Sequence, residues 1–490
     1  MGDLGARCAL LMGRLEDRNY RPENIFTVEQ NGWPGDWEGR TILALTLLSR
    51  ATGRTASYLK EIVAKLPGML NERGYLGPVM PDGVTDEQQL SGHSWLLRGL
   101  LEYSFYSGDG AARSMTKGIV EQLYLPAAGR FSSYPARPEE RQKGGAESGT
   151  IAGEVRSWRV STDTGCAFIS LDGLSQAYEV LGDGRIYALL SEMFEVFQTI
   201  DLMGVSAQTH ATLSAARGIL RLYSVTGEAR FLDAARRVFD LYAARGMTQN
   251  YANFNWFSRP EWTEPCAIID SFLVAMQLFR HTGEARYADL GRKIFRNGVC
   301  RAQRPNGGFG CDTCLTDGDF LAVHAYEAYW CCTMRGGEGL ARAAQYAYFA
   351  DGDAIVVPYF LTSQARVPAG GGEIAIWQRA DGARDGRVRF EIEENTAARE
   401  VTLSILMPEW AENARIEGAA YKIDGRYLAV RADQSFEVLF GVPEYRDGRR
   451  RMRGDDMLGE DESARRFPIA DEYLYPPEEV RARRVRVLFD

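Results

Sequence analysis

The stretch TGEARF at residues 226–231 returns almost unchanged as TGEARY at residues 282–287, about 56 residues further along the chain. In both copies the glycine follows an apolar helical stretch, and glycine suits the position after a helix end because it adopts positive φ without strain. The flanking segments carry apolar residues at i, i+3/i+4 and i+7, the spacing of amphipathic helices. These stripes are Leu213, Ala216, Leu220 and Tyr223 before the first copy, and Phe231, Ala235, Val238 and Tyr242 after it. Each copy therefore predicts the turn of a helical hairpin.

Similar glycine turns recur at Gly53, Gly108, Gly182 and Gly352. Six such turns over about 350 residues predict six helical hairpins. Six hairpins either close into a ring or stack as an open solenoid, and the long loops between them, rich in Gly and Trp, favour the ring. We therefore predict a mainly α fold, with an (α/α)6 toroidal barrel over residues 1–352.

After Asp353 the apolar residues follow a period of two, as in Val388, Phe390 and Ile392. This alternation is the mark of half-buried strands. We predict that residues 353–443 form a small antiparallel β-sandwich domain.

The last segment, residues 444–490, is rich in charge. The run 445–466 has little apolar content and is predicted to be a solvated or disordered linker. Val485, Val487 and Phe489 alternate again and predict one final strand.

The overall composition excludes several classes of protein. The chain has 490 residues and a net charge of −9, so it repels phosphate backbones and is not expected to bind nucleic acid. Its apolar runs are broken by Arg, Asp or Gly too often to span a bilayer, so no membrane segment is expected. The first residues do not resemble a signal peptide, which predicts a cytoplasmic location.

Six of the eight cysteines lie in the last third of the predicted barrel, and five of these form the candidate cluster: Cys266, Cys311, Cys314, Cys331 and Cys332. A reducing cytosol disfavours disulfides, so the clustering indicates metal binding or catalysis. Glu264 precedes Cys266 by two residues, and carboxylates and thiolates are zinc ligands. A CxxC pair also suits redox chemistry, and a purely structural zinc site joining the last two hairpins is the alternative to a catalytic one.

These residues resemble a known family. The order Glu-x-Cys at a helix start, then Cys-Cys after an aromatic stretch, is similar to the zinc- and cysteine-dependent glycoside hydrolases typified by β-L-arabinofuranosidase. The resemblance covers roughly residues 30–440 and includes further short motifs. These are Asn31-Gly32-Trp33 through Gly39, Gly74-Tyr75-Leu76-Gly77, Ser91-Gly92-His93 and Met407-Pro408-Glu409-Trp410-Ala411.

The resemblance implies a Zn²⁺ site made by Glu264, Cys266, Cys331 and Cys332, with Cys331 as the nucleophile. It implies a retaining O-glycosidase that acts on a carbohydrate, a furanoside such as a β-L-arabinofuranoside or a related unusual sugar. It also allows for a homodimer formed through the β-sandwich.

The chain departs from the family pattern at the acid/base position. The stretch 250–256, where the family has a glutamate, holds no carboxylate, so Glu261 and Glu327 are the candidate acid/base residues. Aromatic and histidine side chains predict the sugar contacts, because ring faces stack on sugars. These candidates are His93, His210, Trp33, Trp256 and Trp330.

Three alternatives stay open from the sequence. In the first, the protein is a sugar-binding relative that has a structural zinc site and does not cleave its ligand. In the second, it is another enzyme with an (α/α)6 barrel, such as a sugar epimerase or an unsaturated-glycoside hydrolase. Such enzymes need no thiolate cluster. In the third, it is a helical-repeat scaffold with neither a metal site nor a cavity.

Overall fold

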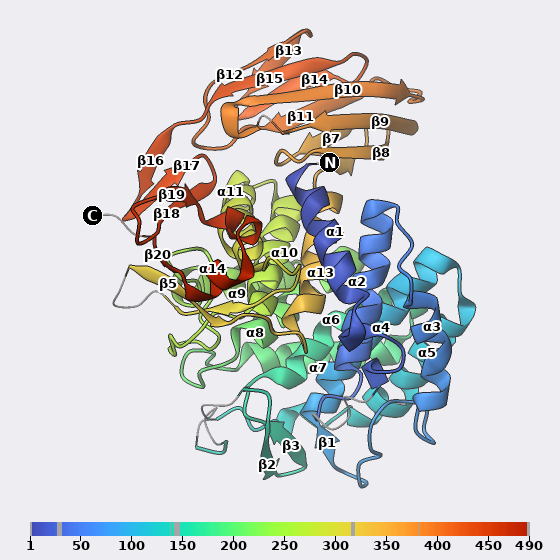
Figure 1. Ribbon diagram of the computed structural model, residues 1–490. Helices are drawn as coiled ribbons and strands as arrows, with labels where there is room; N and C mark the ends of the chain where they lie inside the picture. Colours follow the sequence, from blue (N-terminus) through green and yellow to red (C-terminus); the bar gives the residue numbers. More distant parts are fainter. Residues whose placement is uncertain are drawn as a thin grey trace.

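The computed structural model describes residues 2–26, 32–137, 139–141, 148–314, 319–381 and 383–487. A barrel of helices forms the larger part, and a layer of strands lies against it (Figure 1). Asn31 of the first family-like motif and Phe489 of the predicted last strand lie outside the described residues.

In the described part of the chain, six helices form an inner ring. They are α2 (Asp36–Thr52), α4 (Glu87–Ser107), α6 (Ser170–Leu181), α8 (Thr209–Thr226), α10 (Pro265–Thr282) and α13 (Cys332–Gln345). Each packs against the next, and α13 packs against α2, which closes the ring. The predicted toroidal barrel is therefore confirmed, and the open scaffold is not formed.

Each inner helix has an outer partner. The outer helices are α1 (Asp3–Leu15), α3 (Leu59–Lys65), α5 (Gly110–Ile119), α7 (Gly184–Gln198), α9 (Ala229–Arg245) and α11 (Ala285–Ile294). The repeated TGEAR motif lies at two of the inner-to-outer turns, where Gly227 and Gly283 adopt φ of 74° and 69°. In both copies the glutamate forms an ion pair with the arginine two residues later. The repeat is thus a turn motif, as the sequence predicted.

The inner helices lie unusually close together. A Cβ on Gly39 of α2 would stand 2.2 Å from the backbone nitrogen of Leu96 in α4, and one on Gly218 of α8 would stand 2.3 Å from the carbonyl carbon of Leu171 in α6. Glycine at these crossings is required because any larger residue meets backbone, which cannot move aside. Close packing buries the inner helices almost completely, as in α4 from Glu87 to Ser104.

Two five-stranded sheets make the predicted sandwich. One has the order β12-β15-β10-β9-β8 and the other β13-β14-β11-β7-β6. All the neighbours are antiparallel except β11 and β7. The strands are β6 (Phe349–Asp351), β7 (Ala354–Val357), β8 (Ser363–Ala369), β9 (Gly372–Arg379), β10 (Arg387–Asn395), β11 (Thr402–Leu406), β12 (Glu412–Glu417), β13 (Tyr421–Asp424), β14 (Tyr427–Arg431) and β15 (Phe436–Gly441).

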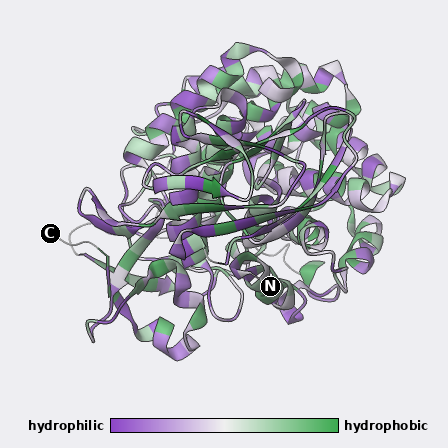
Figure 2. Ribbon diagram, turned by 90° about the horizontal axis from the view of Figure 1, so that it is seen from above, coloured by the Kyte–Doolittle hydropathy of each residue, from purple (hydrophilic) through white to green (hydrophobic). Residues whose placement is uncertain are grey.

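The sandwich lies over one part of the barrel (Figure 2). Ion pairs join the two, since Arg426 of the β13–β14 turn lies 2.7 Å from Asp289 of α11, and Lys293 lies 2.7 Å from Glu409. Inside the sandwich, Val388 and Phe390 are fully buried, as the period of two predicted.

The prediction of a solvated linker at 445–466 is wrong. This segment forms β16 (Glu444–Asp447), β17 (Arg450–Arg453), β18 (Asp456–Glu460) and the start of β19 (Arg466–Pro468). Met452 and Met457 are fully buried, and the arginines are matched by acids, as in the pair Arg296–Asp456 at 2.7 Å. Paired charges and two buried methionines are enough to order a segment with little apolar content.

A last strand does form near the C-terminus. β20 (Arg484–Arg486) pairs with β5 (Phe320–Ala325), which belongs to the loop before α13. The short 3-stranded sheet of β1 (Thr85–Asp86), β2 (Ile151–Val155) and β3 (Trp158–Ser161) covers another part of the barrel. Among the described residues, no helix is both long and apolar enough to cross a membrane.

Candidate functional site

The predicted zinc ligands meet where two neighbouring inner helices begin. Glu264 is the N-cap of α10, Pro265 starts the helix, and Cys266 follows in its first turn. Cys331 is the N-cap of α13 and Cys332 its first residue. Helix N-termini carry partial positive charge, so this position favours carboxylate and thiolate groups.

The three thiols form one compact group. Cys266 Sγ lies 3.6 Å from Cys332 Sγ, and Cys332 Sγ lies 3.3 Å from Cys331 Sγ. The ligand atoms of all three residues lie within 4.8 Å of one another, so the group can hold a metal ion. Cys266 and Cys332 are buried, whereas Cys331 is partly exposed. Of the three residues, Cys331 is therefore the one with some exposed surface.

Glu264 belongs to a second group of ligand atoms, which shares Cys266 with the first. Its side chain lies with those of His210 and Cys266 in a second set whose ligand atoms are within 4.8 Å of one another. Glu264 Oε2 is buried and has no hydrogen-bond partner among the described residues. Burial, with the nearby Asp163 carboxylate, raises the pKa of Glu264 to about 8. The two sets share Cys266, and together they offer a buried carboxylate oxygen without a partner, an imidazole and three thiols, all of which are ligand types that suit Zn²⁺.

Arg40 brings a positive charge to the thiols from α2. Its Nη1 donates to Cys266 Sγ at 3.4 Å, and its Nη2 lies 3.3 Å from His210 Nε2. Asp36, one turn earlier, accepts a hydrogen bond from Arg40 Nε at 2.8 Å and holds the guanidinium in place. A guanidinium at this distance stabilises a thiolate.

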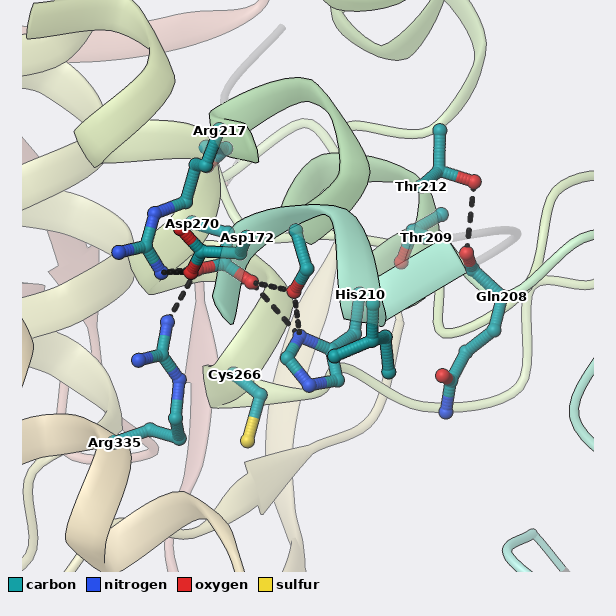
Figure 3. A network of polar contacts seen from close by, with 12 residues as sticks. Asp172, Gln208, Thr209, His210, Thr212, Arg217, Cys266, Asp270 and Arg335 are labelled. Carbon is teal, nitrogen blue, oxygen red and sulfur yellow. Dashed lines mark hydrogen bonds and ion pairs between the residues drawn. The ribbon is translucent and has the colours of Figure 1, made fainter. Parts of the chain in front are cut away.

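Beside the thiols, a buried network of charged side chains lies inside the barrel. Figure 3 shows Asp270 beside the guanidinium groups of Arg217 and Arg335, with His210 in the same network. Glu338 and Asp172 complete it by pairing with Arg98 and Arg217. The described network thus matches its arginines with carboxylates, which is what burial of charge requires.

This network fixes the orientation of His210. His210 Nδ1 lies 2.8 Å from Asp270 Oδ2, and the ring stacks on Trp95 with centroids 5.7 Å apart. Burial lowers the pKa of His210 to about 4. The neutral ring therefore donates from Nδ1 to Asp270 and presents the Nε2 lone pair to the thiol side.

The two cysteines of the CxxC motif, Cys311 and Cys314, lie in different surroundings. Cys311 is a further hydrogen-bond partner of the Cys332 thiol, so it lies at the edge of the thiol group. Cys314 Sγ instead donates to the carbonyl oxygen of Asn253 at 3.6 Å. Hydrogen bonds thus hold the two cysteines of the CxxC motif to different partners.

The two predicted acid/base residues are both held by arginine. Glu261 lies 2.6 Å from Arg259 in an exposed loop. Glu327 lies 2.9 Å from Arg14 of α1 and also accepts a hydrogen bond from Thr333 Oγ1 at 2.9 Å. Glu327 thus joins α1 to the start of α13.

The predicted sugar contacts lie in contrasting surroundings. His93 is fully buried, and backbone groups occupy both its ring nitrogens: Leu76 N donates to Nε2 at 3.0 Å, and Nδ1 lies 2.8 Å from Gln89 O. Two of the family-like motifs, 74–77 and 91–93, are joined by this contact. His93 orients a turn of the backbone, and these contacts leave its nitrogens no capacity for a ligand.

The predicted tryptophans range from buried to exposed. Trp256 is 1% exposed and its Nε1 donates to Asp163 Oδ1 at 2.8 Å. Trp33 is partly exposed and donates to Gly149 O at 2.8 Å. Trp330 is 48% exposed, next to Cys331 in the chain. Trp33 and Trp330 are thus the two whose ring faces are open to contact.

Comparison with solved structures shows which known proteins share this fold. No family model matches the chain, and no curated protein sequence matches it. A solved GH127 β-arabinofuranosidase matches with a TM-score of 0.69 and 13% identity, over 94% of this chain and 84% of the other. The chain has the fold of the GH127 β-arabinofuranosidases. The resemblance that the sequence motifs predicted is confirmed at this level.

Two further solved structures agree. A glycoside hydrolase matches with a TM-score of 0.68 and 14% identity, over 94% of this chain and 81% of the other. A GH127 β-L-arabinofuranosidase from Geobacillus stearothermophilus matches with a TM-score of 0.63 and 15% identity, over 94% and 80%. The likeness thus spans barrel and sandwich together.

Three residues beside the thiols were missed by the sequence reasoning. Arg40 reaches the thiols from a helix more than 200 residues away in the chain, and Asp163 raises the pKa of Glu264 from the loop after β3. Trp95 forms the stacking surface for His210. A signal was present for Arg40, which lies one turn after Asp36 near the start of an inner helix, but nothing in the sequence marked the other two.

Proposed function

We propose that this protein is a retaining glycoside hydrolase that cleaves a furanoside, a β-L-arabinofuranoside or a related unusual sugar, with the Cys331 thiolate as its nucleophile. One observation carries the proposal: three thiols converge at the starts of α10 and α13, Glu264 lies beside one of them, Cys266, and Cys331 is the partly exposed member. The shared fold with the GH127 enzymes supports it.

Glu264, Cys266, Cys331 and Cys332 would hold Zn²⁺ as the cofactor. When bound, the ion supplies the positive charge that keeps the thiols deprotonated at neutral pH. Arg40 adds to this charge from the protein itself.

The reaction then has two steps. The Cys331 thiolate attacks the anomeric carbon and forms a carbon–sulfur bond, while the leaving oxygen takes a proton from a carboxylic acid. The resulting carboxylate next removes a proton from water, whose oxygen displaces the sulfur and restores the thiolate. Two inversions at one carbon retain its configuration.

Three carboxylates are candidates for the acid/base role. Glu261 and Glu327 follow from the sequence, and Asp163 joins them because it lies close enough to Glu264 to raise its pKa. Loss of the true acid slows substrates with poor leaving groups far more than those with activated leaving groups, which need no proton. Comparing Asp163→Asn, Glu261→Gln and Glu327→Gln on alkyl and nitrophenyl glycosides identifies it.

Turnover of a panel of aryl furanosides and pyranosides by the wild type and by Cys331→Ser tests the proposal. We expect hydrolysis of at least one furanoside, and a loss of about a thousandfold or more in the variant. Cys314→Ser is the matched control, because Cys314 donates to a backbone carbonyl and we expect it to retain turnover. Equal rates in the wild type and Cys331→Ser would remove Cys331 as nucleophile.

A second candidate is a sugar-binding protein with a structural zinc site. It is favoured by the arginine partners of Glu261 and Glu327, which hold both carboxylates in ion pairs. It predicts zinc in the protein and binding of a furanoside without release of the aglycone. Calorimetry with the same glycosides separates the two candidates.

A further inference from the structure

The end of the barrel opposite the thiols is hollow. In the described part of the chain, a cavity of about 550 Å³ lies among residues from the middle and C-terminal turns of all six inner helices, from Arg50 in α2 to Arg342 in α13, with Arg113 of α5 beside them. Cavities of 300–1,000 Å³ are typical of small-molecule sites. The thiols lie at the starts of the same helices, so the two places are separated by the length of the barrel.

The lining of this cavity has more arginine than acid. Arg98 and Arg217 also belong to the buried network, where carboxylates match them. Apart from these two, the lining residues leave an excess of three positive charges. They are the arginines Arg50, Arg113, Arg221, Arg280 and Arg342, against the glutamates Glu102 and Glu179.

Compensation of helix dipoles is the simplest competing account. Each helix C-terminus carries about half a negative charge, and arginine is favoured there for that reason. Such arginines usually donate to the last free carbonyls. Here, among the described residues, none of the five donates to a backbone carbonyl; Arg50, Arg221 and Arg342 donate to side chains instead.

Residues of the lining also carry buried polar atoms without a hydrogen-bond partner among the described residues. Arg98 is fully buried, and its Nη2 has no hydrogen-bond partner among the described residues. Arg221 Nε is likewise buried without one. Gln277 contributes the opposite kind of group, because its Oε1 is a buried acceptor without a donor. Buried groups of this kind are normally satisfied, so the wall of the cavity holds unmet hydrogen-bonding capacity.

We propose that this cavity binds the phosphate ester of a small polyol. Guanidinium groups match phosphate oxygens with paired hydrogen bonds, so the excess arginines of the lining would receive the phosphate. The side-chain amides of Gln277 and Gln345, which also line the cavity, would hydrogen-bond the hydroxyls of the polyol. The site is independent of the thiols, and so of the proposed hydrolase activity.

Titration calorimetry with glycerol phosphate, at constant ionic strength, tests the proposal on the full-length protein. Inorganic phosphate and glycerol are the two parallel probes. We expect glycerol phosphate to bind most tightly, phosphate more weakly, and glycerol not at all. Binding should weaken as salt rises, because the attraction is largely electrostatic. No heat of binding from glycerol phosphate up to about 10 mM would overturn the proposal.

Two variants locate the site. Arg280→Gln removes an exposed arginine that lines the cavity, and Arg221→Gln removes a partly buried one. We expect each to weaken glycerol phosphate tenfold or more. Arg73→Gln is the matched control, since Arg73 is exposed and lies outside the cavity lining. If all three variants bind as the wild type does, the ligand lies elsewhere and the proposal is wrong.

Discussion

At the scale of the residue, the thiols owe their properties to what surrounds them. Cys266 is buried, and burial raises its pKa well above the ordinary value. The helix start and Arg40 act in the opposite direction. A bound cation would decide the balance, because thiolates are the form that binds metal.

Metal content is the first prediction at this scale. We expect zinc in the purified protein, and its loss in Cys266→Ala, because this thiol belongs to both sets of converging ligand atoms. Elemental analysis by mass spectrometry measures it. Cys311→Ala is the control and should keep its zinc. The reverse pattern would move the site to the CxxC motif.

The second prediction concerns His93 and pH. Burial lowers the pKa of His93 to about 4, from 6.5 in the unfolded chain. Between these values the unfolded state binds more protons than the folded state, so stability falls as pH falls from 6.5 to 4. The loss amounts to about 3 kcal/mol for this one group. Urea unfolding at several pH values measures it.

A substitution isolates the His93 contribution. His93→Gln cannot take up the proton, so we expect its stability to change less between pH 6.5 and 4 than that of the wild type. His324→Gln is the control, because His324 is exposed and stacks on Trp262. A variant His93→Gln with the wild-type pH dependence would contradict the assignment.

At the scale of the element, close approach of the inner helices makes the barrel narrow enough to bring distant side chains together. Gly39 and Gly99 lie where α2 and α4 cross, and a Cβ on Gly99 would stand 2.6 Å from the carbonyl oxygen of Gly39. The crossing sets the position of α2, and therefore that of Arg40 beside the thiols.

Gly39→Ala tests this crossing. Its Cβ meets backbone of α4, so we expect a loss of about 2 kcal/mol or more in the free energy of unfolding. Gly13→Ala in α1 is the matched control, because a Cβ there meets nothing within 4 Å. Alanine should stabilise that helix by up to about 1 kcal/mol. Chemical denaturation of both proteins provides the comparison.

At the scale of the whole molecule, the C-terminal segment returns to the barrel beside the candidate site. β20 pairs with β5, and Arg7 of α1 donates to Ala470 O at a buried position. An ion pair between Arg301 and Glu472 adds a second link. The segment therefore supports the loop that leads to Cys331.

Val485→Asp tests this support. Val485 is fully buried in β20 opposite Leu321, so a carboxylate there has no water and no partner. We expect a loss of about 3 kcal/mol in stability, together with greater proteolysis of the 319–331 loop. Arg484→Asp, at the exposed neighbouring position, should have little effect. Equal behaviour of the two variants would show that the segment does not hold the loop.

Much of the fold was predictable from local pattern. The TGEAR turns and the apolar stripes specify helical hairpins, and the period of two specifies the sandwich strands, because both signals arise within a few turns of the chain. The segment 445–466 was misjudged because its order depends on partners elsewhere, such as Arg296 for Asp456.

The residues of the candidate site were likewise predictable only in part. Glu264, Cys266, Cys331 and Cys332 were chosen from short motifs at two helix starts, and the structure groups the three thiols and sets Glu264 beside Cys266. Arg40 and Asp163 were not found, because their proximity to the thiols depends on how α2 and the β3 loop cross the barrel.

The sequence by itself determined the hairpins, the strands and the supply of thiols, since turn chemistry and periodicity are properties of neighbouring residues. Tertiary structure decided which charges meet: His210 with Asp270 inside the barrel, and the arginines around the hollow end. The reason is physical. A closed ring places the ends of six helices side by side, and no local pattern states which side chains those ends will share.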